Sequence, residues 1–340
     1  MDRRGDELLQ LLMAAIAAAD PMTVVPPHLP APPEAGRIVV LAAGKAAAAM
    51  ALAAERHYTE TLGLAPDRID GIAVTRHGYG LATRIVPVVE AGHPVPDQAG
   101  IDATRRALDL ARGAGPDDLV VVLLSGGGSA NWVMPRTGID LSEKQALTRS
   151  LLASGASIGE INAVRKHLSA IKGGRLAEAA APARLVTLAI SDVPGDDPAV
   201  IASGPTVADP TTLADARAVL ERYGIEPPAS IAEALATPAD ETTKADAPFL
   251  AGSRYEIVAR PADALAAAAE AARGHGSEAE TPGDALEGGA PNLPARHAGD
   301  DETGAAARRD VAVGDARAAD AELGHAAAHL VRRIGDRDGR

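Results

Sequence analysis

The chain has 340 residues, a length that suits one large domain or two domains of ordinary size. It contains no cysteine, which excludes disulfides, thiolate catalysis and metal–thiolate sites. Its formal net charge of −13 at pH 7 argues against nucleic acid or an anionic membrane surface as the main partner.

The first twenty residues resemble a signal peptide only superficially. Asp6, Glu7 and Gln10 interrupt the apolar run, and the leucines around them fall at helical spacing. No apolar run in the chain approaches the roughly 20 residues that a membrane span needs. We therefore expect an amphipathic first helix, no membrane association and a cytoplasmic location.

Strand and helix patterns alternate along the rest of the chain. Short apolar runs rich in β-branched residues are typical of buried parallel strands. Such runs lie at residues 37–42, 69–75, 85–89, 119–124, 185–190 and 255–258. An alanine-rich helix is expected to follow Lys45 and end near residue 58. Further helices are expected at residues 98–112, 142–153, 159–172, 212–223, 230–235 and 262–273. This alternation predicts an α/β protein, with a doubly wound Rossmann-like domain and a mainly parallel sheet.

The strongest local signal is a glycine-rich loop that follows the 119–124 strand. Consecutive glycines let a ligand approach bare backbone N–H groups, so a loop of this kind can bind an anion. Its spacing is neither GxxxxGK[ST] nor GxGxxG, and a tight turn without a ligand explains it equally well. The next helix is expected near Ser142. The loop consists of Ser125, Gly126, Gly127, Gly128, Ser129 and Ala130.

Two further strand ends carry charged side chains. Lys45 follows the 37–42 strand, and Asp192 follows the 185–190 strand. Because ligands of open α/β sheets bind outside the carboxyl ends of the strands, the lysine, the glycine loop and the aspartate would form one site there. His93 also follows a strand, although a loop histidine satisfied by the backbone is the more common case.

A basic cluster in the 159–172 helix gives a further candidate for anion binding. Its members are Arg165, Lys166, His167 and Lys172, which is unusual in an acidic chain. Only part of the cluster can share one helix face, because residues that lie together on a helix are three or four positions apart. A solvated basic face is the alternative.

Five motifs occur in the order found in one known family. With them the chain resembles, over roughly residues 5–286, the glycerate 2-kinases of the MOFRL-containing type. Members of that family have also carried the older name hydroxypyruvate reductase. The motifs are AAGKAA around Lys45, EAGHPVPD at residues 90–97, LLSGGGSA at residues 123–130, NAVRKHLSAIKGGRLA at residues 162–177 and SDVPGDDPAVIASGPTVADPTT at residues 191–212.

The resemblance implies transfer of the γ-phosphoryl group of ATP to the 2-hydroxyl of D-glycerate, with Mg²⁺, giving 2-phosphoglycerate. Lys45 and Asp192 match the family's functional lysine and aspartate, and the sequence leaves open whether Asp192 acts as base or metal ligand. On this interpretation residues 125–130 bind the phosphates of ATP, and His93, Arg165 and Lys166 contact the small-molecule substrate. The sequence leaves a homodimer open as well.

The C-terminal part departs from the family pattern. Family members continue with a MOFRL domain that normally contains a GRGGRN-like motif, which this chain lacks. We expect a Rossmann-like domain over residues 1–286 and a degenerate, largely disordered tail over residues 287–340, with one amphipathic helix at residues 316–334. A reading-frame change or truncation near residues 275–295 would explain the departure. It would also remove one wall of the active cleft and the family's catalytic arginine, and so impair activity.

Two other functions stay open on the sequence. Loss of the partner domain would leave a non-catalytic remnant that binds a nucleotide or another anion. A hydroxypyruvate reductase is less favoured, because no strand is followed by GxGxxG with an acidic residue downstream.

Overall fold

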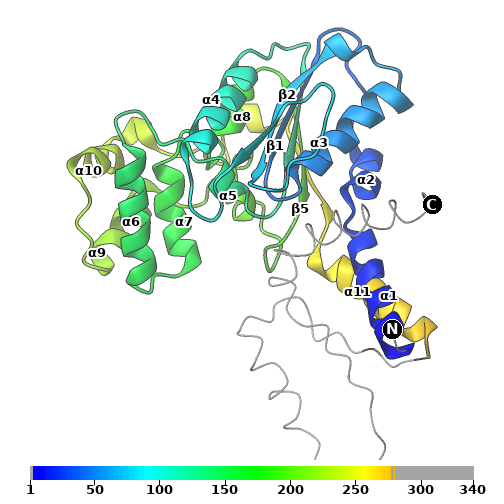
Figure 1. Ribbon diagram of the computed structural model, residues 1–340. Helices are drawn as coiled ribbons and strands as arrows, with labels where there is room; N and C mark the ends of the chain where they lie inside the picture. Colours follow the sequence, from blue (N-terminus) through cyan, green and yellow to red (C-terminus); the bar gives the residue numbers. More distant parts are fainter. Residues whose placement is uncertain (1–2, 277–278, 280–340) are drawn as a thin grey trace, which may run out of the picture. The chain divides into compact units, whose positions relative to one another are not determined.

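The computed structural model describes residues 3–276 and residue 279, and the chain divides into two units. One unit spans Val25–Val258 and contains the sheet (Figure 1). Of the described residues, the other combines residues 3–24 with residues 259–276. The tail predicted over residues 287–340 and its helix lie outside the described residues, and a single domain over residues 1–286 stays a prediction.

The larger unit is built on a mainly parallel sheet. Its strands are β1 (Ile38–Ala43), β2 (Ile69–Arg76), β3 (Val88–Ala91), β4 (Leu119–Leu124), β5 (Arg184–Ile190) and β6 (Arg254–Ala259). Within the described residues they follow the order β3–β2–β1–β4–β5–β6, and the first five form parallel pairs. This is a strand order of the doubly wound fold, so the predicted fold class is confirmed.

Helices cover both faces of the sheet. α3 (Ala47–Arg56) packs on β1, β2 and β4, whereas α4 (Gln98–Arg112) packs on β1, β2 and β3. Figure 1 shows these two helices on opposite sides of the strands. The other helices are α1 (Arg3–Ala18), α2 (Pro21–Val24), α5 (Gly128–Asn131), α6 (Leu141–Ala153), α7 (Ile158–His167), α8 (Arg175–Ala180), α9 (Leu213–Arg222), α10 (Ala229–Ala236) and α11 (Pro261–Gly274).

Hydrophobic clusters in the described part of the larger unit form on the sheet and, separately, among its helices. Every residue of β1 and β4 is buried, which explains why these strands are continuous apolar runs in the sequence. A second core joins α6, α7, α9 and α10, with Leu151, Val164 and Ile231 fully buried in it. The sheet therefore does not depend on the helical group for its own core.

Three predicted elements differ from the structure. β3 begins at Val88 rather than at residue 85. The helix expected over residues 159–172 ends at His167, because the hydroxyl of Ser169 instead accepts hydrogen bonds from the amides two and three residues further on, both at 3.3 Å. A short helix that was not predicted, α5, begins inside the glycine loop at Gly128 and precedes α6, the helix expected near Ser142.

The smaller unit contains α1 and α11, which pack against each other. Leu11 of α1 is buried, but Leu8 and Leu12, which the prediction placed on the same apolar face, are both 42% exposed. Among the described residues one helical stretch, Asp6–Val24, is long and apolar enough to cross a membrane. The stretch meets this criterion of length and mean hydropathy although Asp6, Glu7 and Gln10 interrupt it, and core helices and signal sequences meet the same criterion.

A buried lysine ties α6 to the end of α7. The Lys144 side chain donates from Nζ to the carbonyl oxygen of Leu168 at 3.1 Å. Burial, reinforced by the positive charges of Arg165 and Arg175, lowers the pKa of Lys144 to about 7. Since the pKa of an unfolded lysine is about 10.4, the folded protein binds fewer protons than the unfolded chain between these values.

We expect Lys144 to make stability rise with pH. Because the unfolded chain binds the extra proton, this group should add up to about 2 kcal/mol to the free energy of unfolding between pH 7 and pH 9. Lys144→Met keeps the apolar volume but cannot titrate. Between pH 7 and pH 9 the unfolding free energy of this variant should therefore rise by about 2 kcal/mol less than that of the wild type. Urea unfolding of both proteins at pH 7, 8 and 9 measures the difference. Parallel pH dependences would show that the buried amine keeps an ordinary pKa.

Candidate functional site

Two loops meet where the strand order of the sheet reverses, between β1 and β4. The amide of Lys45 donates to the carbonyl oxygen of Gly126 at 2.8 Å. The hydroxyl of Ser125 accepts a hydrogen bond from the amide of Ala46 at 3.0 Å. Gly44 has φ +123°, and a Cβ there would lie 2.4 Å from the carbonyl oxygen of Ser125, so the close approach requires glycine. In doubly wound folds this reversal point is where ligands bind.

The glycine loop presents unpaired backbone amides. In the described part of the chain, the N–H groups of Gly126, Gly127 and Ser129 donate to no protein acceptor. Gly127 has φ +84°, in the left-handed region that favours glycine. Because buried or half-buried amides normally find partners, three unpaired ones on a single loop suit an anionic ligand that supplies several oxygens.

Three of the predicted side chains lie against this loop. A Cβ at Gly126 would lie 2.0 Å from Oδ2 of Asp192. A Cβ at Gly127 would lie 2.9 Å from Nε2 of His93 and 3.4 Å from Cγ of Lys45. The structure therefore brings together the lysine, the loop, the histidine and the aspartate, each of which follows a different strand.

The charged groups of this cluster are available to a ligand. Within the described residues, the ammonium of Lys45 and the carboxylate of Asp192 form no hydrogen bond or ion pair. Burial lowers the pKa of His93, and the positive charges of Lys45 and Arg76 lower it further, against the opposing effect of Asp192. The imidazole is therefore neutral at neutral pH, and the cluster holds one free cation and one free carboxylate.

The predicted basic cluster separates in the structure. Arg165 reaches the glycine loop, where its Nη2 lies 3.4 Å from the carbonyl oxygen of Ser129. Lys166 instead forms a buried ion pair with Asp209, with 2.6 Å between Nζ and Oδ1. This pair occupies the ammonium of Lys166, whose contact with a substrate stays a prediction. Of the two predicted substrate contacts in this helix, Arg165 and Lys166, the structure places Arg165 at the glycine loop.

Lys172 binds backbone carbonyl oxygens of the glycine loop and of the residues that follow it. Its buried Nζ donates to the carbonyl oxygens of Ser129 and Trp132, both at 2.8 Å. Burial, with the positive charges of Arg165 and Lys144, lowers the pKa of Lys172 well below its ordinary value. Lys172 thus holds carbonyl oxygens of the segment whose amides remain unpaired.

Two residues that act on members of the candidate site escaped the sequence analysis. The hydroxyl of Ser203 lies 2.7 Å from the hydroxyl of Ser129. Arg76 ends β2 and lies close enough to His93 to lower its pKa. Arg76 could have been found, because it follows the strand-end rule that identified Lys45 and Asp192. Ser203 belongs to a quoted motif, but nothing in its local sequence indicates its contact with a loop 74 residues earlier.

The described residues contain no group of three or more His, Asp or Glu side chains that could hold a metal ion. Asp192 nevertheless offers an unpaired carboxylate beside amides that suit phosphate oxygens. Mg²⁺ is usually held by one or two carboxylates together with substrate phosphates and water. Asp192 fits that mode of binding rather than a site built entirely from protein ligands.

A family model described as "Domain of unknown function (DUF4147)" matches residues 7–236 of the chain. The chain belongs to the DUF4147 family. The matched range includes Lys45, His93, the glycine loop, Asp192 and Ser203, so the whole candidate site lies within the DUF4147 region.

Relatives of this DUF4147 chain carry two different names. A protein from Agrobacterium vitis, provisionally named hydroxypyruvate reductase, is 52% identical over 281 residues. A glycerate 2-kinase from Pyrococcus horikoshii is 44% identical over 243 residues. The crystal structure of a glycerate kinase from Thermotoga maritima matches with a TM-score of 0.71 and 39% identity. The resemblance to glycerate kinases predicted from the motifs is therefore confirmed.

The alignments with these three proteins cover 83%, 68% and 82% of this chain. They cover 62%, 53% and 64% of the relatives themselves. The DUF4147 chain thus spans less than two thirds of the length of each relative. The activity of a full-length relative therefore has to be tested directly in this chain.

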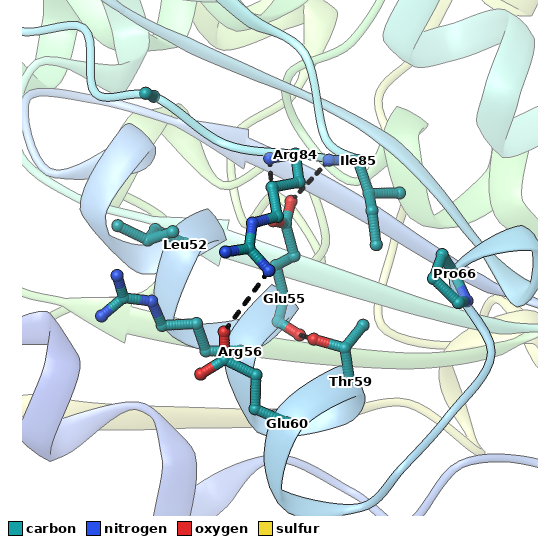
Figure 2. A pocket seen from close by; sticks show the side chains of 9 residues that line it. Leu52, Glu55, Arg56, Thr59, Glu60, Pro66, Arg84 and Ile85 are labelled. Atoms are coloured by element: carbon teal, nitrogen blue, oxygen red, sulfur yellow. Dashed lines mark hydrogen bonds and ion pairs between the residues drawn. The ribbon is translucent and has the colours of Figure 1, made fainter.

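A separate pocket of about 270 Å³ lies along α3 of the DUF4147 region (Figure 2). Of its two carboxylates, Glu55 accepts hydrogen bonds from the amides of Arg84, Ile85 and Val86 at 2.8–3.1 Å, and Glu60 lies 4.0 Å from the guanidinium of Arg84. Glu55 lies at the far end of α3 from Lys45, about 15 Å along the helix at 1.5 Å per residue. This pocket therefore does not share the unpaired groups of the candidate site.

Proposed function

We propose that this protein is a glycerate 2-kinase of the cytoplasm that transfers the γ-phosphoryl group of ATP to the 2-hydroxyl of D-glycerate. One observation carries the proposal. Three amides, an ammonium and a carboxylate that have no partner among the described residues converge where ligands bind in doubly wound sheets. The names of the Pyrococcus and Thermotoga relatives support the choice of glycerate as acceptor.

The residues present suit phosphoryl transfer, which needs positioning and charge neutralisation more than covalent chemistry. In the proposal, the amides of Gly126, Gly127 and Ser129 bind phosphate oxygens of ATP. Lys45 neutralises charge on the transferring group or on the carboxylate of glycerate. Asp192 accepts the proton of the 2-hydroxyl as its oxygen attacks phosphorus.

His93 and Arg165 complete the proposed acceptor site. A neutral imidazole can donate one hydrogen bond and accept another, which suits a substrate with two hydroxyl groups. The guanidinium of Arg165 suits the carboxylate of glycerate. When bound, Mg²⁺ would be held by Asp192 and the phosphates and would reduce the negative charge on them.

The reductase name of the Agrobacterium relative is the main competitor. A nicotinamide site of the Rossmann type has GxGxxG after the first strand and an acidic residue downstream. Here the first strand is followed by Gly44 and Lys45, and the glycine loop after β4 reads SGGGSA. A cation beside a loop of unpaired amides favours transfer of a phosphoryl group over transfer of a hydride.

The test is a direct comparison of activities with the purified full chain. We expect ADP release that requires D-glycerate, ATP and Mg²⁺, and a product that enolase converts to phosphoenolpyruvate, as only the 2-phosphate allows. NADH oxidation with hydroxypyruvate and no ADP release would overturn the proposal in favour of the reductase. ADP binding in calorimetry without turnover would overturn it in favour of a non-catalytic remnant.

A further inference from the structure

The segment that follows β5 contains an unusual backbone. Asp196, Ala202 and Ser203 are the non-glycine residues with positive φ in the described part of the chain, at +53°, +50° and +63°. Ala202 and Ser203 are consecutive, and Gly204 continues the left-handed backbone at +58°. A left-handed conformation costs a non-glycine residue about 1–2 kcal/mol, so it persists only where surrounding contacts enforce it.

These residues are held between two other parts of the site. The carbonyl oxygens of Ser203 and Gly204 accept hydrogen bonds from the amides of Gly173 and Gly174, at 3.1 and 2.8 Å. On the other side, a Cβ at Gly128 would lie 2.9 Å from the Cβ of Ala202. The left-handed pair is therefore packed directly against the glycine loop.

Among the described residues, the hydroxyl of Ser203 has one partner, and that partner belongs to the glycine loop. Ser203 is fully buried, and within the described residues its Oγ bonds only to Oγ of Ser129, at 2.7 Å. Ser129 is half-buried and carries one of the unpaired amides. If Ser203 did not donate its proton to Ser129, that proton would be buried without an acceptor, which costs about 1–3 kcal/mol.

We infer that Ser203 is a positioning residue for phosphate binding, because its buried hydroxyl donates to Ser129 and leaves the Ser129 hydroxyl free to donate to an anionic oxygen. The Ser129 hydroxyl then joins its own amide and those of Gly126 and Gly127 around a phosphate oxygen of the nucleotide. This inference rests on the proposed function for the identity of the ligand. It adds a side-chain donor to the loop and explains why a strained backbone is kept beside it.

The test compares three variants by ADP calorimetry and by kinetics. Ser203→Ala removes the donor and keeps the left-handed backbone. Ser203→Gly removes the donor and also removes the strain of the left-handed φ, because glycine adopts this conformation readily. It therefore keeps the test possible if the alanine variant does not fold. Both should weaken ADP binding and raise the KM for ATP by about tenfold, as expected for one hydrogen bond to a charged group. The KM for D-glycerate should change less than twofold.

Ser129→Ala should weaken ADP binding by the same factor, and Ser129→Ala combined with Ser203→Gly should weaken it no further, because both act through one hydrogen bond. The matched control is Thr206→Val. Thr206 forms a buried hydroxyl pair with Thr187 at 2.8 Å, and its loss should lower stability without changing ADP affinity. Additive losses at Ser129 and Ser203, or equal ADP affinities of the Ser203 and Thr206 variants, would overturn the inference.

The two proposals can fail separately. If the wild-type chain binds ADP but does not phosphorylate D-glycerate, the proposed function fails, and the role of Ser203 is decided by the ADP affinities alone. If the wild-type chain binds neither ADP nor ATP, both proposals are overturned.

Discussion

Replacing Lys45 with methionine should lower the rate of D-glycerate-dependent ADP release by two to three orders of magnitude. Methionine keeps the apolar stem of the side chain and removes only the ammonium, which has no partner among the described residues. Losing one preorganised group that stabilises transition-state charge typically costs about 10²–10³ in kcat. The fold should be unaffected, because no hydrogen bond or ion pair of the described chain depends on this ammonium.

The charge-retaining variant Lys45→Arg separates charge from shape. It should recover part of the lost rate if neutralisation of charge is the main role, and little if the compact ammonium must contact one oxygen. Circular dichroism and thermal unfolding confirm that each variant is folded. A methionine variant with the wild-type rate would remove Lys45 from the mechanism.

Gly126→Ala should lower the rate of D-glycerate-dependent ADP release at least as much as Lys45→Met does. The added Cβ would lie 2.0 Å from Oδ2 and 2.5 Å from Cγ of Asp192, so the carboxylate must move away from the loop. The φ of Gly126 is not positive, so alanine meets no left-handed backbone strain there, and the three atoms nearest to the added Cβ all belong to Asp192. A displacement of about 1 Å at a reacting group can cost about 10²-fold in rate.

Gly252→Ala is the matched control for this substitution. Gly252 also lacks a positive φ, and apart from its chain neighbours no atom of the described residues lies within 4 Å of a Cβ built on it. Its kcat and unfolding midpoint should equal those of the wild type. A Gly126→Ala protein with wild-type kcat would show that Asp192 need not lie against the loop, and would exclude it as the base of the reaction.

Much of the fold could be predicted because its strongest signals are local. β1 and β4 are buried on both faces, so burial itself makes them continuous apolar runs. α4 was predicted with its bounds, because Asp97 caps it by accepting from the amide of Gly100 at 3.0 Å. The start of β3 was misplaced because the strand has only four residues, of which one is buried, and this leaves a weak pattern.

The site was predictable only as far as strand ends determine it. Lys45, the glycine loop and Asp192 were found because parallel strands bring their carboxyl ends to one edge. The buried pair of Lys166 and Asp209 joins residues 43 positions apart, so the sequence could not show that this lysine is engaged. Ser203 was missed because its role depends on a left-handed φ at a non-glycine residue, which no residue type indicates.

The order of the strands has a consequence for how this protein would respond to its ligand. A nucleotide held by the proposed groups would touch segments that leave β1, β4 and β5, which are far apart along the chain and adjacent only in the folded sheet. Such a molecule acts as a non-covalent cross-link, and it binds the native state but not the unfolded chain. By mass action, the free energy of binding would then add to the cooperative stability of the sheet, so saturation with nucleotide would also protect strands it never touches.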